Sequence, residues 1–210
     1  METQNKGART RLEIVRHAAP LFNQHGYEGT SLSDLMGATG LKKGGIYRHF
    51  SSKEELALDA FDYAWGHAVA GRLEGVREVA DCLDRLKKMV DNFVEKRAGL
   101  VPGGCPLLNT AIDADDGNAA LRSRAKIAMQ WWTNRISGVV SEGIHKRQID
   151  PHVNPRKLSQ VMIGCLEGAL MISRIQATDA PLQNAREHLH RYLEQNIRAT
   201  GAKSKRVRAS

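Results

Sequence analysis

The stretch from Thr30 to Glu55 constrains the fold of this 210-residue chain more than any other. Its first part carries Leu32, Leu35 and Met36 at positions i, i+3 and i+4, which is the spacing of one buried helical face. Gly40 follows, and glycine supplies the left-handed backbone conformation that a tight turn between two helices requires. The stretch therefore predicts a short helix that ends in a turn.

A second helix is expected directly after this turn, from about Lys42 to His49. It would bury Ile46, with Phe50 just beyond its end, and leave a basic outer face exposed. Thr30 and Ser31 both belong to the residue types that cap helix N-termini, so the first helix is expected to start there. A helix, a glycine-containing turn and a basic second helix form the helix-turn-helix arrangement, whose second helix enters the major groove of DNA.

The same residues carry a family resemblance. The sequence GYEGTSLSDLMGATGLKKGGIYRHFSSKEEL, from Gly26 to Leu56, resembles the N-terminal DNA-binding domain of TetR-type (tetracycline-repressor-like) transcriptional regulators. The match covers the first part of the chain and is specific, because it joins the cap, the turn, the second helix and the following segment in one order and spacing. The resemblance implies a homodimer that binds a palindromic double-stranded operator DNA and responds to a small-molecule effector.

The resemblance assigns DNA contact to the outer face of the second helix and to nearby helix N-termini, where free N–H groups bind phosphate. Tyr47 and His49 have an alternative role, which is to pack against the first helix. Gly44 and Gly45 make a weak start for the second helix, because each glycine costs about 1 kcal/mol of helix stability relative to alanine. DNA is therefore expected to order this helix. The residues predicted to bind DNA are Thr30, Lys42, Lys43, Gly44, Gly45, Tyr47, His49 and Lys53.

Helical patterns account for the rest of the chain, and no run of useful length alternates as a β-strand does. Thr10 and Glu13 form a capping box that predicts the start of the first helix, with its end at Gly26 and residues 1–9 unstructured. We therefore expect an all-α protein. An N-terminal three-helix helix-turn-helix DNA-binding domain (residues 1–51) would join a larger helical effector-binding and dimerisation domain (52–200), followed by a basic disordered tail (201–210).

Composition and charge place the chain among soluble globular proteins. It is 41% hydrophobic and 26% charged with a net charge of +8, but residues 198–210 hold five basic residues and no acidic one. The DNA inference therefore rests on the motif, and the tail either binds phosphates without sequence preference or is solvated. The three cysteines form no paired motif, no secretory leader is present, and the apolar run 161–172 is too short to span a bilayer. These features favour a cytoplasmic protein with no membrane partner.

The larger domain is expected to hold a pocket for a small apolar or aromatic effector. Large, soft apolar side chains would line it, although core packing is the alternative for each of them. Cys105, in the segment GGCP, is expected to be a structural thiol; a redox sensor is the alternative, but no basic residue near it in sequence would lower its pKa. The residues predicted to line the pocket are Cys105, Leu107, Met129, Trp131, Trp132, Met162 and Cys165.

A helix from Pro155 to about Gln176 is apolar on nearly every face, so both of its sides must be covered. Gly164 and Gly168 lie four residues apart on one face and would let another helix approach closely. That helix belongs to a second subunit or, as the alternative, to the same subunit. The residues predicted for the dimer interface, a four-helix bundle across a two-fold axis, are Gly164, Gly168, Leu189 and Leu193.

No arrangement of residues supports catalysis or a metal cofactor. The eight histidines have no metal-ligand spacing. The acidic run from Asp113 departs from a calcium loop, because its glycine comes early and Arg124 stands where the bidentate glutamate belongs, so we expect a polar turn with Asn118 as a helix cap. We predict a ligand-responsive transcriptional repressor, not an enzyme. The alternative is a helical nucleic-acid-associated module that binds without sequence preference.

Overall fold

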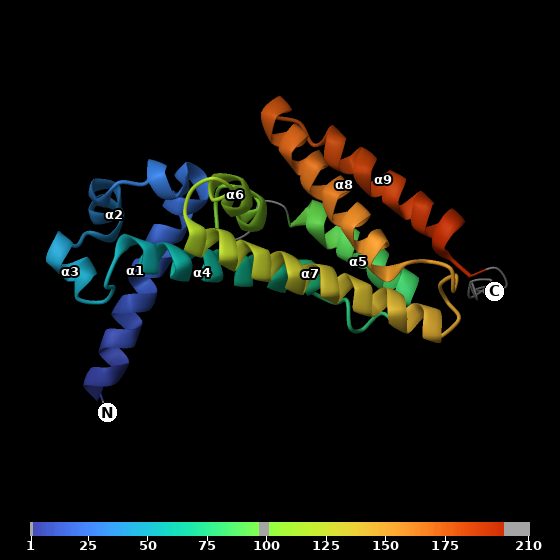
Figure 1. Cartoon of the computed structure of the whole chain (residues 1–210), viewed down its shortest axis with the longest axis horizontal. Helices are drawn as coiled ribbons and strands as arrows, with labels where there is room; N and C mark the ends of the chain where they lie inside the picture. Colours follow the sequence, from blue (N-terminus) through green and yellow to red (C-terminus); the bar gives the residue numbers. More distant parts are fainter. Residues whose placement is uncertain (1, 97–100, 200–210) are drawn as a thin grey trace, which may run out of the picture. The chain divides into compact units, whose positions relative to one another are not determined.

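The computed structural model describes residues 2–96 and 101–199, and the predicted tail at 201–210 lies outside them. The described residues form helices joined by loops, with one isolated β-bridge between Ile149 and Arg198 (Figure 1). The prediction of an all-α fold is confirmed. The helices are α1 (Glu2–Gly29), α2 (Leu32–Thr39), α3 (Lys43–Tyr47), α4 (Lys53–Leu73), α5 (Cys82–Glu95), α6 (Pro106–Asp113), α7 (Ala119–His145), α8 (Pro155–Gln176) and α9 (Ala180–Tyr192), which continues as a π-helical turn (Leu193–Ile197).

The backbone packs as two compact units, and each unit draws on two stretches of the chain. Of the described residues, 2–71, 96 and 101–130 belong to the first unit, while 72–95 and 131–199 belong to the second. Helices α4 and α7 each begin in the first unit and end in the second. The predicted domains, residues 1–51 and 52–200, divide the chain by function and stay predictions.

The first unit has an apolar core to which each of its first four helices contributes. These side chains are almost completely removed from water, which makes their burial the main source of stability for this unit. Because α3 and the loop after it contribute to the core, α3 is held on its inner side while its outer side stays exposed. The core residues are Ile14, Val15, Ala18, Leu35, Ile46, Phe50 and Leu56.

Helix α1 begins at Glu2 and not at Thr10, so its predicted start was wrong. The Thr10 hydroxyl donates to the carbonyl oxygen of Lys6 (3.0 Å), one turn earlier in the helix, and therefore does not cap the helix. Pro20 lies inside α1. Helical geometry is interrupted at Gly26, whose φ of 73° is left-handed, and this is where the sequence predicted the end of the first helix.

The segment before α6 and the end of α6 are fastened to the end of α1 by hydrogen bonds. Asn109 Nδ2 donates to the carbonyl oxygens of Asn23 (2.9 Å) and Gly103 (2.8 Å). The N–H of Tyr27 donates to Asp113 Oδ2 (2.8 Å). Glycine is required at position 103, because its φ is 119° and a β-carbon would lie 2.6 Å from Asn23 Nδ2. The GGCP segment is therefore part of the support of α1.

In the second unit α5, α8 and α9 pack together, and α9 lies alongside α8 (Figure 1). Arg72 and Glu167 form an ion pair (3.4 Å) in the interior of this unit. The Arg72 guanidinium also lies over the ring of Phe93, 4.5 Å from its centre. A buried ion pair adds little net stability, but removal of one partner would take this ion pair from the other buried charge and destabilise the unit. The pair therefore holds the end of α4 against α8.

Helix α8 is, among the helices described, the one long and apolar enough to cross a membrane, with 22 residues and a mean hydropathy of 1.3 in its most apolar stretch. The apolar run at residues 161–172, which was expected to be too short, is thus part of a longer helix. Half of that stretch is buried inside the protein. Asn154 caps α8 by accepting from the Lys157 N–H (2.9 Å), and Pro155 opens its first turn.

Candidate DNA-binding and effector sites

Helices α2 and α3 are joined by a turn in the helix-turn-helix manner. Ser31 caps α2: its hydroxyl accepts from the Asp34 N–H (3.1 Å), and the Asp34 carboxylate accepts from the Ser31 N–H (2.8 Å). Hydrogen bonds from the Ser31 side chain and backbone hold the pKa of Asp34 below its ordinary value. Gly40 ends α2 with a left-handed φ of 67°, which confirms the predicted turn.

Thr30, predicted both to cap α2 and to contact phosphate, is completely buried. Its hydroxyl donates to the carbonyl oxygen of Gly26 (2.7 Å), so its side chain fixes the loop between α1 and α2 while Ser31 supplies the cap. A side-chain contact from Thr30 to DNA is therefore not available in this conformation. A phosphate contact at this position would have to come from the backbone N–H groups of the first turn of α2.

Helix α3 begins at Lys43 and ends at Tyr47, so it is shorter than the predicted span. Lys42 precedes it in an extended conformation and makes no side-chain cap. Ile46 is 1% exposed and anchors the helix in the core of the first unit. Glycines make up two of its five residues, and their low helix propensity makes the helix intrinsically weak.

The outer side of α3 carries most of the residues predicted to bind DNA. Of these, Lys42, Lys43 and Gly44 are exposed. The Lys43 ammonium lies 6.0 Å from the centre of the Tyr47 ring. Gly45, Tyr47, His49 and Lys53 are partly buried, so each still presents some surface. The helix thus combines positive charge with open backbone at Gly44, while the side chain of Leu41 lies beside Gly45.

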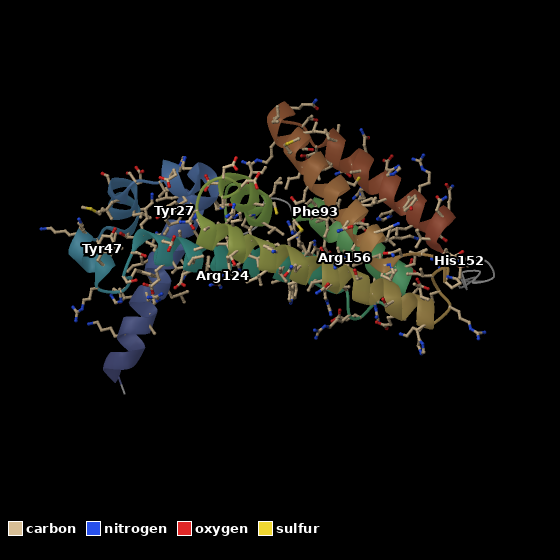
Figure 2. All side chains as sticks on the ribbon, in the orientation of Figure 1. Tyr27, Tyr47, Phe93, Arg124, His152 and Arg156 are labelled. Carbon is tan, nitrogen blue, oxygen red and sulfur yellow. The ribbon has the colours of Figure 1, made fainter. Side chains whose placement is uncertain are left out.

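Tyr27 lies in the same unit as Tyr47 and was not among the residues predicted to bind DNA (Figure 2). The Lys53 ammonium lies 4.4 Å from the centre of its ring. Partial burial is the main cause that raises the pKa of Tyr27, and nearby Glu54 adds to the effect. Its hydroxyl therefore keeps its proton at neutral pH and can donate to a phosphate oxygen. The signals in the sequence were its place in the stretch that carries the family resemblance and its position directly after Gly26.

A cluster of Arg11, Glu55 and Asp59 fastens α1 to α4. Arg11 Nη2 donates to Glu55 and to Asp59, both at 2.7 Å. Its Nη1 donates to the carbonyl oxygen of His49, which ties the residues after α3 to the same cluster. Glu55 accepts from the hydroxyl and the N–H of Ser51 (2.7 Å each), and these bonds, with Arg11 next, lower its pKa from 4.5 to about 2. Arg11 thus links α1 to α4 and to the residues that follow α3.

The residues predicted to line an effector pocket are divided between the two units. Cys105, Leu107 and Met129 lie in the first unit, and Trp131, Trp132, Met162 and Cys165 lie in the second. Cys105 is buried and caps α6, with its Sγ accepting from the Leu108 N–H (3.5 Å), which favours the structural role for this thiol. Trp131 is 45% exposed, whereas Trp132 is buried. Their assignment to one pocket stays a prediction.

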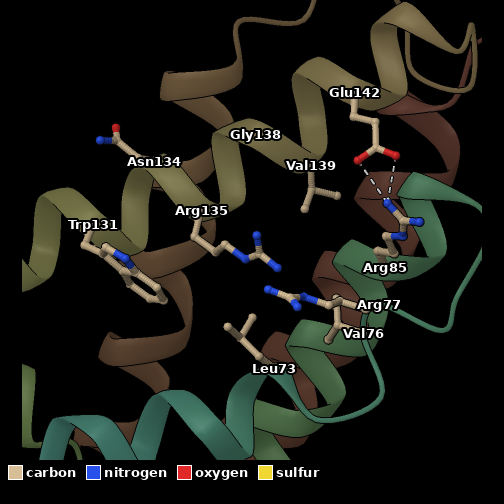
Figure 3. A pocket seen from close by; sticks show the side chains of 10 residues that line it. All are labelled: Leu73, Val76, Arg77, Arg85, Trp131, Asn134, Arg135, Gly138, Val139 and Glu142. Atoms are coloured by element: carbon tan, nitrogen blue, oxygen red, sulfur yellow. Dashed lines mark hydrogen bonds and ion pairs between the residues drawn. The ribbon is translucent and has the colours of Figure 1, made fainter.

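The second unit contains an open cavity of about 550 Å³, bounded by the segment after α4, by α5 and by α7 (Figure 3). Of the residues predicted for the effector pocket, Trp131 alone lines this cavity. The other residues that line the cavity are brought together only by packing and carry no sequence motif, so helical periodicity could not predict them. They include Leu73, Val76, Arg77, Arg85, Arg135 and Glu142.

One face of α8 is apolar and exposed. Gly164 and Gly168 lie on it, and a β-carbon at either position would meet no described atom within 4 Å. The described part of the subunit therefore places no neighbour against these glycines, and the alternative of a close contact within the subunit is wrong. The same face exposes large apolar side chains, namely Val161 (57%), Met171 (46%), Ile172 (41%) and Ile175 (77%).

Leu189 and Leu193 do not belong to an exposed face. They are 1% and 0% exposed, and they are buried in the second unit, where α9 packs against α5 and α8. The prediction that they form part of the dimer interface is therefore wrong. Their helical stripe faces the core of their own subunit.

The acidic run after α6 is a polar turn. Asn118 Oδ1 accepts from the Leu121 N–H (2.8 Å) and so caps α7, while Asn118 Nδ2 donates to Glu54 (2.6 Å). Among the described residues, no group of three or more His, Cys, Asp or Glu side chains is placed to hold a metal ion.

Comparison with known proteins gives two family matches. Residues 14–60 match the family described as bacterial regulatory proteins of the tetR family, and residues 82–189 match the tetracyclin repressor-like C-terminal domain. The crystal structure of a TetR transcriptional regulator from Chloroflexus aurantiacus is 43% identical, with a TM-score of 0.88 over 93% of this chain and 100% of that one. A TetR family regulator from Cytophaga hutchinsonii is 36% identical, with a TM-score of 0.86 over 93% and 98% of the two chains. The HTH-type transcriptional repressor ComR of Escherichia coli is 29% identical over 75% of this chain and 76% of its own.

Proposed function

This chain belongs to the TetR family of bacterial transcriptional regulators, and from that premise we propose that it is a cytoplasmic, ligand-responsive repressor that binds a palindromic operator as a homodimer. The observation that carries the proposal is the helix-turn-helix of α2 and α3, whose inner side is buried in a shared core while its cationic outer side is exposed. The similarity to ComR, which is named a repressor, supports repression as the direction of control.

In this proposal α3 lies in the major groove. Lys42 and Lys43 donate to phosphate oxygens, and Lys53, in the first turn of α4, meets the backbone beside them. Gly44 and Gly45 let the main chain of α3 approach the wall of the groove, since no side chain stands between them. The charged residues supply affinity that depends on salt, and the close backbone approach fixes the position of the helix.

Tyr47 and His49 are the side chains of the predicted set that can reach base edges. Both keep part of their surface exposed, and the main chain of His49 is held by Arg11. Tyr27 joins the surface as a neutral hydroxyl donor for a phosphate. We assign Thr30 a backbone contact, because its hydroxyl is engaged inside the protein.

The exposed face of α8 is the surface that we propose for the dimer. Val161, Met171 and Ile175 supply apolar area, and Gly164 and Gly168 let the helix of the second subunit come close. A two-fold axis would place the same face of α8 on both sides of the contact. Two helix-turn-helix heads could then read half-sites about 34–36 Å apart, one helical turn of DNA.

The helical part beyond the DNA-binding head is where we place the effector. A ligand can lower operator affinity only by binding more tightly to a conformation that fits the operator poorly. Helix α4 directly follows the helix-turn-helix in the chain, so a change in its position is the simplest way to move the heads.

Selection from a random double-stranded DNA library tests the proposal against the alternative of binding without sequence preference. We expect a palindromic motif to be enriched, with half-sites one helical turn apart, and to be held against a large excess of random DNA. Binding that yields no enriched motif and is lost to random competitor would favour the non-specific module.

A further inference from the structure

Three arginines and a single carboxylate line the cavity of the second unit. Arg77, Arg85 and Arg135 are the cations, and Glu142 is the carboxylate. Arg85 donates twice to Glu142 (2.9 and 3.0 Å), and Lys146 donates to the same carboxylate (2.6 Å). These hydrogen bonds lower the pKa of Glu142, so it stays ionised. The one negative charge at the cavity is thus already paired with two cations, and none is left for the other arginines.

Arg77 and Arg135 therefore carry positive charge into the cavity without a counterion. Neither side chain makes a hydrogen bond or ion pair with another described residue, and the Nε of Arg135 is buried without an acceptor. Their guanidinium groups point toward one another (Figure 3). Arg77 is exposed and Arg135 is partly buried, so water screens part of the repulsion between the two like charges, whereas the buried N–H of Arg135 without an acceptor is unfavourable. An anion between the two guanidinium groups would relieve both conditions.

Apart from these charged residues and Asn134, the side chains of the cavity wall are apolar. Trp131 is 45% exposed despite its size, and Leu73, Val76 and Val139 stand with it around the cavity. A β-carbon at Gly138, which also lines the cavity, would meet no described atom within 4 Å, so there is free space beside this part of α7. The volume of about 550 Å³ falls within the range of sites that take small organic molecules.

We propose that this cavity binds a small organic oxyanion, with its carboxylate or phosphate group between Arg77 and Arg135 and its aromatic or aliphatic part against Trp131. The planar guanidinium group suits this headgroup, because it offers paired N–H donors that match the oxygens of carboxylate and phosphate. The binding of this ligand does not depend on the proposed function. Its role as the effector rests on the proposed function. It replaces the apolar or aromatic effector expected from the sequence with an amphipathic anion.

Isothermal titration calorimetry on the full-length protein without DNA tests this site. The probes are 2-naphthoate, 2-naphthyl phosphate and neutral 2-naphthamide, which share one ring system and differ in the headgroup. We expect at least one of the two anions to bind at least about tenfold more tightly than the amide, since hydrogen bonds to charged groups are the stronger ones. The tighter of the two anions identifies the headgroup class.

Substitutions then locate the binding. Arg77→Gln and Arg135→Gln should each lower the affinity for the tighter-binding anion about tenfold or more and leave the affinity for the amide unchanged. Gly138→Leu should abolish anion binding without altering any charge, because its side chain enters the open cavity. Arg156→Gln removes an exposed arginine of α8 that does not line the cavity, and it should bind as the wild type does.

Equal affinities for the anions and the amide would overturn the proposal, and so would an undiminished anion affinity in both Arg135→Gln and Gly138→Leu. The proposal would also be overturned if neither anion bound saturably. Because DNA is absent from the titration, each of these results would leave the proposed operator binding standing. A failure to select an operator would, in turn, leave the anion site standing.

Discussion

Gly44 is an exposed residue in the first turn of α3, and a β-carbon there would meet no described atom within 4 Å. Gly44→Ala should stabilise the free protein by about 0.5–1 kcal/mol, because glycine is the poorer helix residue. The same substitution should weaken operator binding, since the proposal brings this backbone against the wall of the groove. Gly37→Ala in α2, which also has open space around it, should stabilise the protein and leave binding unchanged. Thermal unfolding and operator titration measure the two effects, and full affinity in Gly44→Ala would contradict the close approach.

Lys43 tests the electrostatic part of the same surface. Lys43→Ala should weaken operator binding and reduce the slope of log K against log salt by about one, as the loss of a single phosphate contact does. Stability should stay within about 0.5 kcal/mol of wild type, because the side chain is exposed. Tyr47→Ala should also weaken binding. Lys126→Ala, which removes an exposed lysine of α7, is the control and should keep both the affinity and the slope. An unchanged slope in Lys43→Ala would remove its phosphate role.

Single residues could be predicted from the sequence where local backbone chemistry decides their role. Gly40 is such a residue, because only a left-handed conformation allows the turn after α2. Thr10 shows the limit: the capping-box spacing is present, but the helix continues past it to Glu2. Leu189 and Leu193 show another limit. Their period shows that one face of α9 is buried, but it does not say whether their own subunit or a partner buries it.

At the scale of elements, the cluster of Arg11, Glu55 and Asp59 should make the junction of α1 and α4 sensitive to acid. The pKa of Glu55 is about 2 in the folded protein, against an ordinary 4.5, mainly because the hydroxyl and the N–H of Ser51 donate to it and next because Arg11 does. A lowered pKa means that its contribution to stability is complete above about pH 4.5 and is lost as the pH falls toward 2. Glu55→Gln should therefore lower the melting temperature at pH 7, and the difference from wild type should shrink between pH 4.5 and 2.

Circular dichroism melts across this pH range measure the effect. Glu13→Gln is the matched control, because its ion pair with Arg16 is exposed and contributes little to stability. A melting temperature for Glu55→Gln equal to that of the wild type at pH 7 would show that the bonds of the Glu55 carboxylate to Ser51 and Arg11 do not stabilise the fold.

Elements whose partners lie close in sequence were predictable, and those held by distant partners were not. The helix, turn and second helix between Ser31 and Tyr47 follow from caps, glycine and apolar spacing within a short stretch. The hydrogen bonds that join Asn23 to Pro102, Gly104 and Asn109 connect segments about 80 residues apart, and no local pattern encodes them. The arginine-lined cavity is unpredictable for the same reason, since α5, α7 and the segment after α4 meet there only through packing.

At the scale of the whole molecule, function as proposed depends on two copies. A palindromic operator offers two half-sites, and one helix-turn-helix head binds only one of them. Joining two heads makes the second contact intramolecular, which can raise affinity by about 10²–10⁴ without any new protein–DNA contact. The exposed apolar face of α8 matters for this reason: left uncovered, it would be a large apolar patch in water.

Gly168→Leu tests that face directly. The glycine has open space around it within the described subunit, so leucine should leave the subunit fold intact. In a close helix–helix contact between subunits, the same side chain would overpack the interface by about 1–3 kcal/mol per copy. We therefore expect a folded monomer with an unchanged DNA-binding head and an operator affinity lower by about 10² or more. Analytical ultracentrifugation at micromolar concentration measures the assembly, and circular dichroism checks the fold. Gly138→Leu, the same change at an open glycine of α7, should remain dimeric, whereas a stable Gly168→Leu dimer would move the interface to another surface.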